Sequence, residues 1–418
     1  MKAIAVVLCG LVLLCSPGVV LAQGEGMSDE GTKTPLGVEA RSGKLVFESA
    51  DKEFQWWIDS RIQIDGAMYF ENKNAMSNGT IMRRATLALK SILWKDWQAE
   101  IDMDFGDAVL DARDIWIRYN FRDVNLALQV GNFKEPFGLE RLNSSRLLTF
   151  LERSTVTNAI ALGRRMGFAA RYWTDYGQVT LGVFGHELGT KVDKGTLDEG
   201  FSTNARLTLA PVNNKRETIH LGLAASYKTP DVTPDLAPNT IEINTRTETY
   251  VNDLKALHSG DITDVNYYTR IGGELGGVYG PLYVQGEVMA TQVKRWYGKP
   301  SANFAGGYGT ISYMLTGESR VYYVDEGEFG PVDKPASPWG ALEVAARYSI
   351  LSLNDLDAGI RGGKCNQMMF GINWYPNMNF KIQLNFSSVK LDDNATSKGR
   401  LNPGDSYSFM QMRFQASL

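Results

Sequence analysis

The sequence contains almost no long hydrophobic run. Its one extended apolar stretch covers residues 3–14, which is shorter than the roughly twenty residues that a transmembrane helix needs. Lys2 precedes this stretch, and a Pro-Gly break followed by small residues leads to Ala22. A charged start, a short apolar segment and a small-residue site together predict a secretory signal peptide over 1–22. The pattern argues against a membrane protein built from helices and indicates an exported chain.

Cysteine and histidine are also scarce. Of the three cysteines, Cys9 and Cys15 leave with the predicted signal peptide, so the exported chain keeps only Cys365 and forms no internal disulfide. Only three histidines occur. His220 shares a face of its predicted strand with Ser226, but the two are three positions apart along that face, too far for the hydrogen bond of a Ser/His nucleophile. We therefore predict that the protein is not an enzyme.

The chain lacks a Pro/Ser-rich linker and any shift of periodicity, although about four hundred residues would ordinarily suggest two or more domains. We expect one large unit over 54–418, preceded by an N-terminal periplasmic segment at 23–53. Within that segment, residues 44–49 are predicted to form a small hairpin with the residues that follow Phe54.

The most abundant pattern in the sequence is the alternation of apolar and polar residues. Ile58, Ile62 and Ile64 alternate with polar residues, and the period of two persists to the C-terminus. A soluble β-sandwich would show the same alternation. Aromatic residues, however, flank nearly every predicted tight turn, as Trp94 and Trp97 do. This is the girdle expected where a transmembrane β-barrel meets the two membrane interfaces.

Connection lengths alternate as well. Tight turns are separated by longer polar loops, 229–265 and 352–364 among them, which is typical of outer-membrane barrels. One connection, 317–338, is long although it lies on the short-turn side. We predict an all-β, antiparallel transmembrane barrel of sixteen strands. The strands are expected at 54–70, 80–93, 97–105, 112–121, 124–133, 164–174, 178–186, 201–210, 217–228, 266–278, 281–293, 303–316, 339–351, 365–375, 379–391 and 406–418.

The third long loop, 134–163, carries apolar residues that favour a loop folded into the lumen. From Lys134 to Arg171 the chain has seven Lys or Arg against three Asp or Glu, although its net charge is −4. Guanidinium groups offer phosphate and carboxylate oxygens a planar fork of donors. We predict an anion-binding constriction formed by Arg83, Arg84, Lys134, Arg141, Arg146, Arg153, Arg164 and Arg165.

Counter-charges to these cations are expected on the lumen face at Asp102, Asp104 and Asp114, with Asp102 and Asp104 beside Arg84. Adjacent inward residues lie about 7 Å apart along a strand, so Glu100, Asp102 and Asp104 are better explained as counter-charges than as calcium ligands. For any single residue, solvation of a polar lumen is the simpler interpretation. We predict no metal and no cofactor.

The chain resembles the phosphate-selective porin O/P family in the runs IMRRATLALKSILWKDWQAEIDMDF, GNFKEPFGLERLNSSRLLTFLERS and GRRMGFAARYW, and the resemblance covers nearly the whole mature chain. It implies a sixteen-stranded, trimeric outer-membrane porin with an inward-folded third loop. In the phosphate-selective members, paired arginines and a basic loop residue form an anion site at the narrowest point. The resemblance places these on Arg83 and Arg84, with the loop residue at Lys134.

We therefore expect passive uptake of small anions, such as phosphate or polyphosphate, through a homotrimer embedded in the outer-membrane lipid of a Gram-negative bacterium, with no nucleic-acid partner. Two alternatives stay open: a general, weakly selective diffusion porin, and a non-conducting outer-membrane binding barrel. Single-channel conductance in a planar bilayer separates them.

Overall fold

The computed structural model of the protein describes residues 36–41, 44–70, 73–106, 108–161, 163–188, 199–231 and 239–417. The predicted signal peptide, residues 23–35 and Leu418 lie outside these ranges. Within the described part of the chain, no helix is long and apolar enough to cross a bilayer.

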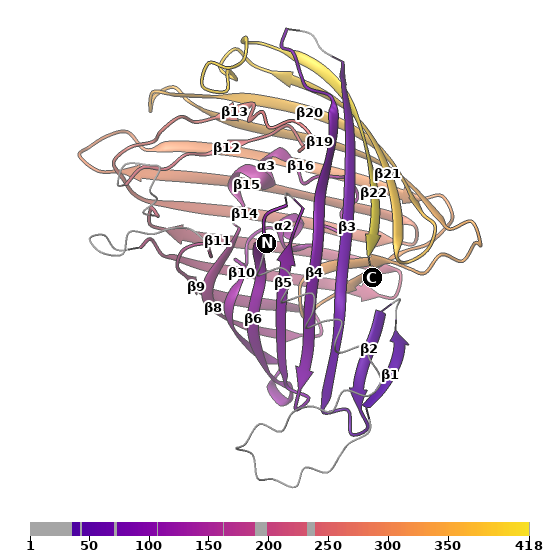
Figure 1. Ribbon diagram of the computed structural model, residues 1–418. Coiled ribbons are helices and arrows are strands. Elements are labelled where there is room, and N and C mark those ends of the chain that lie inside the picture. Colours follow the sequence, from indigo (N-terminus) through magenta and orange to yellow (C-terminus); the bar gives the residue numbers. More distant parts are fainter. Residues whose placement is uncertain are drawn as a thin grey trace. The chain divides into compact units, whose positions relative to one another are not determined.

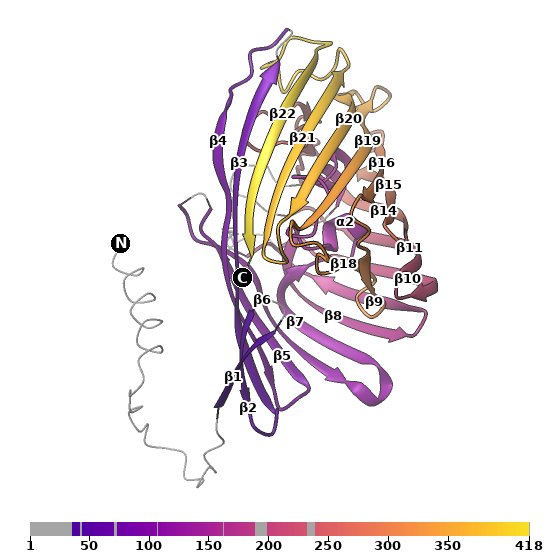
Figure 2. The same cartoon turned by 90° about the vertical axis from the view of Figure 1, so that its right-hand side faces the viewer.

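Sixteen antiparallel strands form the barrel predicted from the sequence, and it closes because β22 pairs with β3. Neighbours in the wall follow chain order, as Figure 1 and Figure 2 show. In order, the barrel strands are β3 (Phe54–Phe70), β4 (Gly79–Leu93), β5 (Trp97–Asp104), β6 (Asp111–Phe121), β7 (Leu126–Lys134), β8 (Arg164–Thr174), β9 (Gly177–Phe184), β10 (Ser202–Asn214), β11 (Glu217–Lys228), β14 (Val265–Tyr279), β15 (Leu282–Arg295), β16 (Ala302–Met314), β19 (Ala341–Asp355), β20 (Ile360–Tyr375), β21 (Phe380–Leu391) and β22 (Ser406–Ser417).

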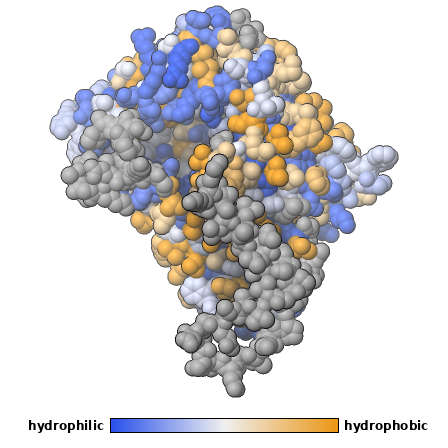
Figure 3. All heavy atoms as spheres, in the orientation of Figure 1, coloured by the Kyte–Doolittle hydropathy of each residue, from blue (hydrophilic) through white to orange (hydrophobic). Residues whose placement is uncertain are grey.

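In the barrel wall, polar side chains are buried on the lumen side and apolar side chains are exposed on the outside, the reverse of a soluble protein. Along β3, Asp59, Gln63 and Asp65 are 4%, 0% and 2% exposed, whereas Ile62 and Ile64 are 48% and 43% exposed. Figure 3 shows apolar atoms over the outer surface of the strands and hydrophilic atoms toward the loop ends. The apolar face therefore meets lipid and the polar face lines the lumen, as the alternation predicts.

One predicted outer loop is wrong. Residues 352–364 continue β19 and β20, which are joined by a turn at 356–359, with Asp355 opposite Ile360. The alternation of polar and apolar residues is absent here because the inward face of this part of the strands is apolar instead of polar. Leu353 is fully buried in an apolar cluster with Leu257 inside the lumen, so polar residues no longer mark that face.

Two strands precede the barrel. β2 (Lys44–Ser49) pairs with the start of β3, where Val46 faces Trp57, as the predicted hairpin requires. β1 (Leu36–Arg41) pairs with β2 in turn, an extension that the sequence did not indicate. The ring of Phe47 stacks on that of Trp56 at 4.0 Å, which fixes this segment on the short-turn end of the wall.

The remaining elements belong to the connections. The turn after β6 contains η1 (Arg122–Val124), and the loop after β7 contains α2 (Leu139–Leu142) and α3 (Thr155–Ile160). The loop after β11 contains β12 (Asn244–Thr245) and β13 (Leu257–His258), and the connection after β16 contains β17 (Arg320–Tyr323) and β18 (Glu328–Val332). The last three of these connections fill part of the lumen.

Candidate functional site

The loop between β7 and β8 folds into the barrel, as predicted. Phe137, Leu139 and Leu151 are fully buried, and Phe150 is nearly so. Helix α3 packs against β15, β16 and β19, so the loop covers the inner wall on that side. Apolar burial of this extent gives the loop a core of its own and holds it in one place.

Polar contacts fasten the same loop to the wall. The Glu287 carboxylate accepts hydrogen bonds from the backbone N–H groups of Leu139 (2.8 Å) and Glu140 (2.7 Å) at the start of α2. Asn385 on β21 accepts one from Leu151 N–H (3.0 Å). Because these backbone donors would otherwise be buried without partners, the wall residues make the inward position of the loop the favourable one.

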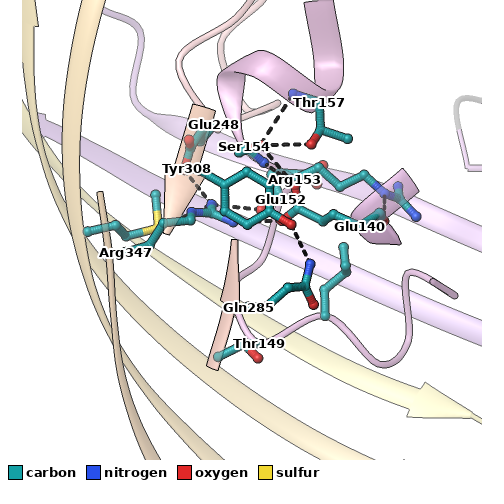
Figure 4. A network of polar contacts seen from close by, with 12 residues as sticks. Glu140, Thr149, Glu152, Arg153, Ser154, Thr157, Glu248, Gln285, Tyr308 and Arg347 are labelled. Carbon is teal, nitrogen blue, oxygen red and sulfur yellow. Dashed lines mark hydrogen bonds and ion pairs between the residues drawn. The ribbon is translucent and has the colours of Figure 1, made fainter. Parts of the chain in front are cut away.

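Arg347 on β19, at the left of Figure 4, connects several residues of the network drawn there. Its guanidinium pairs with Glu140 (3.0 Å) and with Glu248, and it donates to the backbone carbonyl of Glu152 (2.8 Å). Ser154, the N-cap of α3, donates to Glu140 through its backbone N–H (3.0 Å). Arg347 faces inward, but it holds the loops and does not line the cavity described below.

A second loop, 239–264, also enters the lumen, which the sequence analysis missed. Thr249 hydrogen-bonds the Tyr69 hydroxyl (3.0 Å), and the Glu248 carboxylate accepts from Thr155 N–H (3.0 Å). These contacts bring Tyr250 beneath Arg83, whose guanidinium carbon lies 3.8 Å from the ring centre. The signal was weak because this loop is polar and looks like an outer loop.

Between the inward loops and the wall formed by β3–β10 lies a cavity of about 790 Å³. Thirteen Lys or Arg residues line it against eight Asp or Glu residues, so the cavity is basic although the chain is net negative. The basic residues are Arg61, Arg83, Arg84, Lys90, Arg113, Arg118, Lys134, Arg141, Arg146, Arg153, Arg164, Arg171 and Arg206.

A β-bulge explains why both members of the Arg83–Arg84 pair reach the cavity. Gln63 of β3 faces Arg84, whereas the next residue, Ile64, faces Met82, so Arg83 is an extra residue in β4. In a regular strand two consecutive side chains would point to opposite faces. The bulge re-aims one of them, and both guanidiniums line the lumen.

Several cavity cations bind neutral partners. Arg84 donates to the side-chain oxygen of Gln63 (2.7 Å), and Arg153 donates to the backbone carbonyl of Asn143 (2.7 Å). Lys134 donates to the same carbonyl (3.3 Å). Burial and the neighbouring Arg141 lower the pKa of Arg153 to about 10, so it stays protonated at neutral pH. Among the described residues, no carboxylate pairs with any of these three side chains, and Arg153 keeps its positive charge at neutral pH.

Other predicted cations form ion pairs. Arg83 pairs with Glu152 (2.7 Å), Arg146 with Asp59 (2.6 Å) and Arg164 with Asp114 (2.6 Å). Burial alone would raise the pKa of Glu152, but Arg83 and Arg413 hold it well below its usual range. The Arg141 side chain lines the cavity next to Gly163.

A sequence profile of the family described as "Phosphate-selective porin O and P" matches residues 57–417. The chain belongs to this porin family. It is 26% identical to Porin O of Pseudomonas aeruginosa, over 88% of this chain and 91% of that protein. The porin is accordingly a channel of the Gram-negative outer membrane and not an enzyme.

Solved outer-membrane structures share its fold. An anion-selective porin from Comamonas acidovorans superposes with a TM-score of 0.54 at 15% identity, over 88% of this chain and 100% of that one. OmpT of Vibrio cholerae, in its trimer form, superposes with a TM-score of 0.52 at 9% identity, over 87% and 99%. At these identities the likeness shows the fold alone.

Two predicted site residues of the porin make contacts other than those we expected. Arg165 is not among the residues lining the cavity; it pairs with Glu135 (3.0 Å) and Asp231 (2.7 Å) on the outer-loop side. Asp104 pairs with Arg113 (2.8 Å) and not with Arg84. Its carboxylate nevertheless lies beside Arg84, as expected, because it accepts a hydrogen bond from the backbone N–H of the next residue, Ala85 (3.0 Å).

Sequence reasoning missed Arg113 because a second bulge lies in β6. Ile101 faces Ile115 and Met103 faces Ala112, so Arg113 and Asp114 together oppose one residue of β5. Both line the cavity, although alternation assigns them to opposite faces. Nothing in the composition of this stretch marks the bulge.

Carboxylate oxygens of Glu100, Asp102 and Asp114 lie within 4.8 Å of one another at the cavity wall. Lys90 pairs with Glu100 (3.1 Å), and Arg164 pairs with Asp114. One carboxylate oxygen of Asp102 is buried without a hydrogen-bond partner. The cluster is the acidic part of an otherwise basic cavity.

Proposed function

We propose that the porin conducts small oxyanions, phosphate or polyphosphate among them, through the cavity between the inward loops and β3–β10. The observation that carries this proposal is the excess of cations along the cavity, with Arg84, Lys134 and Arg153 bonded to neutral partners. The other proposed site residues contribute to the electrostatic potential along the same cavity. Passage requires that each contact be weak enough to release the anion.

Local charge, not net charge, supports this selectivity. A charge focused along a narrow path outweighs charges that are distant and screened. One unit charge about 5 Å from the ion contributes about 0.8 kcal/mol in water, a factor of about four in occupancy. The formal net charge of −4 on the whole chain is therefore compatible with anion passage.

The test is the reversal potential in a planar bilayer under a KCl gradient. We expect anion selectivity in the unmodified porin, and a decrease of about tenfold in the anion-to-cation permeability ratio when Arg83 and Arg84 are both replaced by Ala. Replacing the exposed, non-lining pair Arg361 and Lys390 by Ala removes the same charge and serves as the control.

A cation-selective unmodified channel, or equal shifts in the two double variants, would instead support a general diffusion porin. A barrel that gives no conductance steps would support the binding-barrel alternative.

We also propose that the porin is a homotrimer in contact with outer-membrane lipid and that residues 23–53 lie in the periplasm. The trimer form of OmpT and the exposed apolar wall support this arrangement.

A further inference from the structure

The connection between β16 and β19 enters the lumen from the short-turn end. Phe329 of its hairpin, β17–β18, is 2% exposed and packs against the rings of Tyr283 and Tyr322. The Tyr322 hydroxyl lies 2.7 Å from a ring nitrogen of His220 on the wall. This connection, unusual for its length in the sequence, is therefore a built part of the pore.

The tip of the hairpin is held by Arg206 of β10. Its guanidinium donates to the backbone carbonyls of Gly327 (2.8 Å) and Glu326 (3.3 Å) while it pairs with Glu274 (2.8 Å). Gly327 has φ of +64°, and a Cβ there would lie 2.7 Å from the Thr208 hydroxyl. The wall thus fixes the tip, and only glycine fits at its closest approach.

The fixed tip places the Glu326 carboxylate between two arginines. One of its oxygens lies 3.2 Å from Arg118 on β6, and the other lies 2.5 Å from Arg171 on β8. All three residues line the cavity. The Glu326 side chain is 33% exposed, so cavity water and solutes reach it.

Glu326 stays ionised at neutral pH. Burial alone would raise its pKa, but Arg171 and Arg118 lower the pKa to about 2. Arg118 also donates to the side-chain oxygen of Gln129 (3.0 and 2.8 Å), and Arg171 also donates to the backbone carbonyl of Asp325 (3.3 Å). Glu326 is the carboxylate that pairs with both guanidiniums at the cavity.

We propose that Glu326 is a built-in competitor for permeating oxyanions at the short-turn end of the cavity. Its two oxygens take the positions that two oxygens of a phosphate would take between the same arginines. An incoming oxyanion must displace it, and its return displaces the oxyanion toward the periplasm. The inference rests on the proposed anion conduction.

The two glutamates of the hairpin allow a matched test. Glu328 also lines the cavity and is the same residue type, but no ion pair joins it to Arg118 or Arg171 in the described structure. We would measure block of chloride conductance by inorganic phosphate in planar bilayers for the unmodified porin, Glu326→Gln and Glu328→Gln.

Freeing the two arginines should lower the half-blocking phosphate concentration about tenfold in Glu326→Gln, the factor expected for one charge-assisted hydrogen bond. The change in Glu328→Gln should be clearly smaller. If Glu326→Gln does not assemble, Glu326→Asp retains the charge but withdraws the carboxylate, and it should shift block in the same direction by less.

If the channel is anion-selective but Glu326→Gln and Glu328→Gln have the same half-blocking phosphate concentration, this inference is overturned. The proposed function is then unaffected. If Glu326→Asp is the only one of these variants at position 326 that assembles, an unchanged half-blocking phosphate concentration in Glu326→Asp overturns this inference in the same way. Cation selectivity of the unmodified porin, measured in the same bilayers, overturns the proposed function and this inference with it.

Discussion

Replacing Arg347 by Ala should release the lumen loops without opening the barrel. Arg347 is the cation shared by Glu140 of one inward loop and Glu248 of the other. Its side chain is 2% exposed, and those of its partners are 6% and 0% exposed. The substitution leaves two buried carboxylates without their cation and the Glu152 carbonyl without its donor.

Removing one partner of a buried ion pair costs about 3–5 kcal/mol. The strand ladders do not depend on Arg347, and the contacts of Glu287 and Asn385 with the loop remain. This free-energy cost therefore destabilises the inward position of the loops and not the barrel. It raises the population of loop-displaced states by about a hundredfold or more, which should increase single-channel conductance, add open-channel noise and weaken anion selectivity.

The assay is single-channel recording combined with limited proteolysis of the detergent-solubilised porin, where cleavage within 135–163 reports the displaced loop. Arg361→Ala on the neighbouring strand β20 removes the same charge from an exposed position and should behave as the unmodified porin. Unchanged conductance, noise and protease resistance in Arg347→Ala would show that the apolar core of the loop holds it without the ion pairs.

Two further predictions concern cavity carboxylates. Asp102→Asn should raise the anion-to-cation permeability ratio by about fourfold or more, because it removes one negative charge from the cavity wall and a unit charge about 5 Å from an ion changes the occupancy of that ion about fourfold in water; an unchanged reversal potential would contradict this. Glu326 has its pKa lowered to about 2, below the roughly 4.3 of a free glutamate, so its contact with Arg118 and Arg171 is fully formed above about pH 4 and is lost as pH falls through about 2. Chloride conductance of the unmodified porin should therefore approach that of Glu326→Gln between about pH 4 and pH 2, and a constant difference between them would refute the assignment.

The barrel could be predicted from the sequence because in each membrane strand every second residue faces lipid and is apolar, while the residues between face the lumen and are polar. Asp59, Ile62 and Gln63 already show which face meets lipid, and the turn aromatics show where the membrane ends. The inward third loop was also predictable, because residues such as Phe137 and Phe150 must be buried somewhere. These signals are local in the chain.

The partners of the cavity charges could not be predicted in the same way. Arg84 bonds Gln63 across one strand pair, whereas Arg83 bonds Glu152 from a loop 69 residues away. Tyr250 and Glu326 reach the cavity from connections that fold inward from opposite ends of the wall. Such contacts depend on how loops pack in the lumen, and alternation within a strand carries no information about that.

The two bulges are the points at which local pattern and site chemistry disagree. A regular strand presents one inward side chain per two residues, about 7 Å apart. By placing extra residues at Arg83 and at Arg113–Asp114, the wall brings consecutive charged side chains into one part of the lumen. The density of charge along the cavity therefore exceeds what regular strands could supply, and Lys134 at the end of β7 and Arg141 and Arg153 of the inward loop add to it.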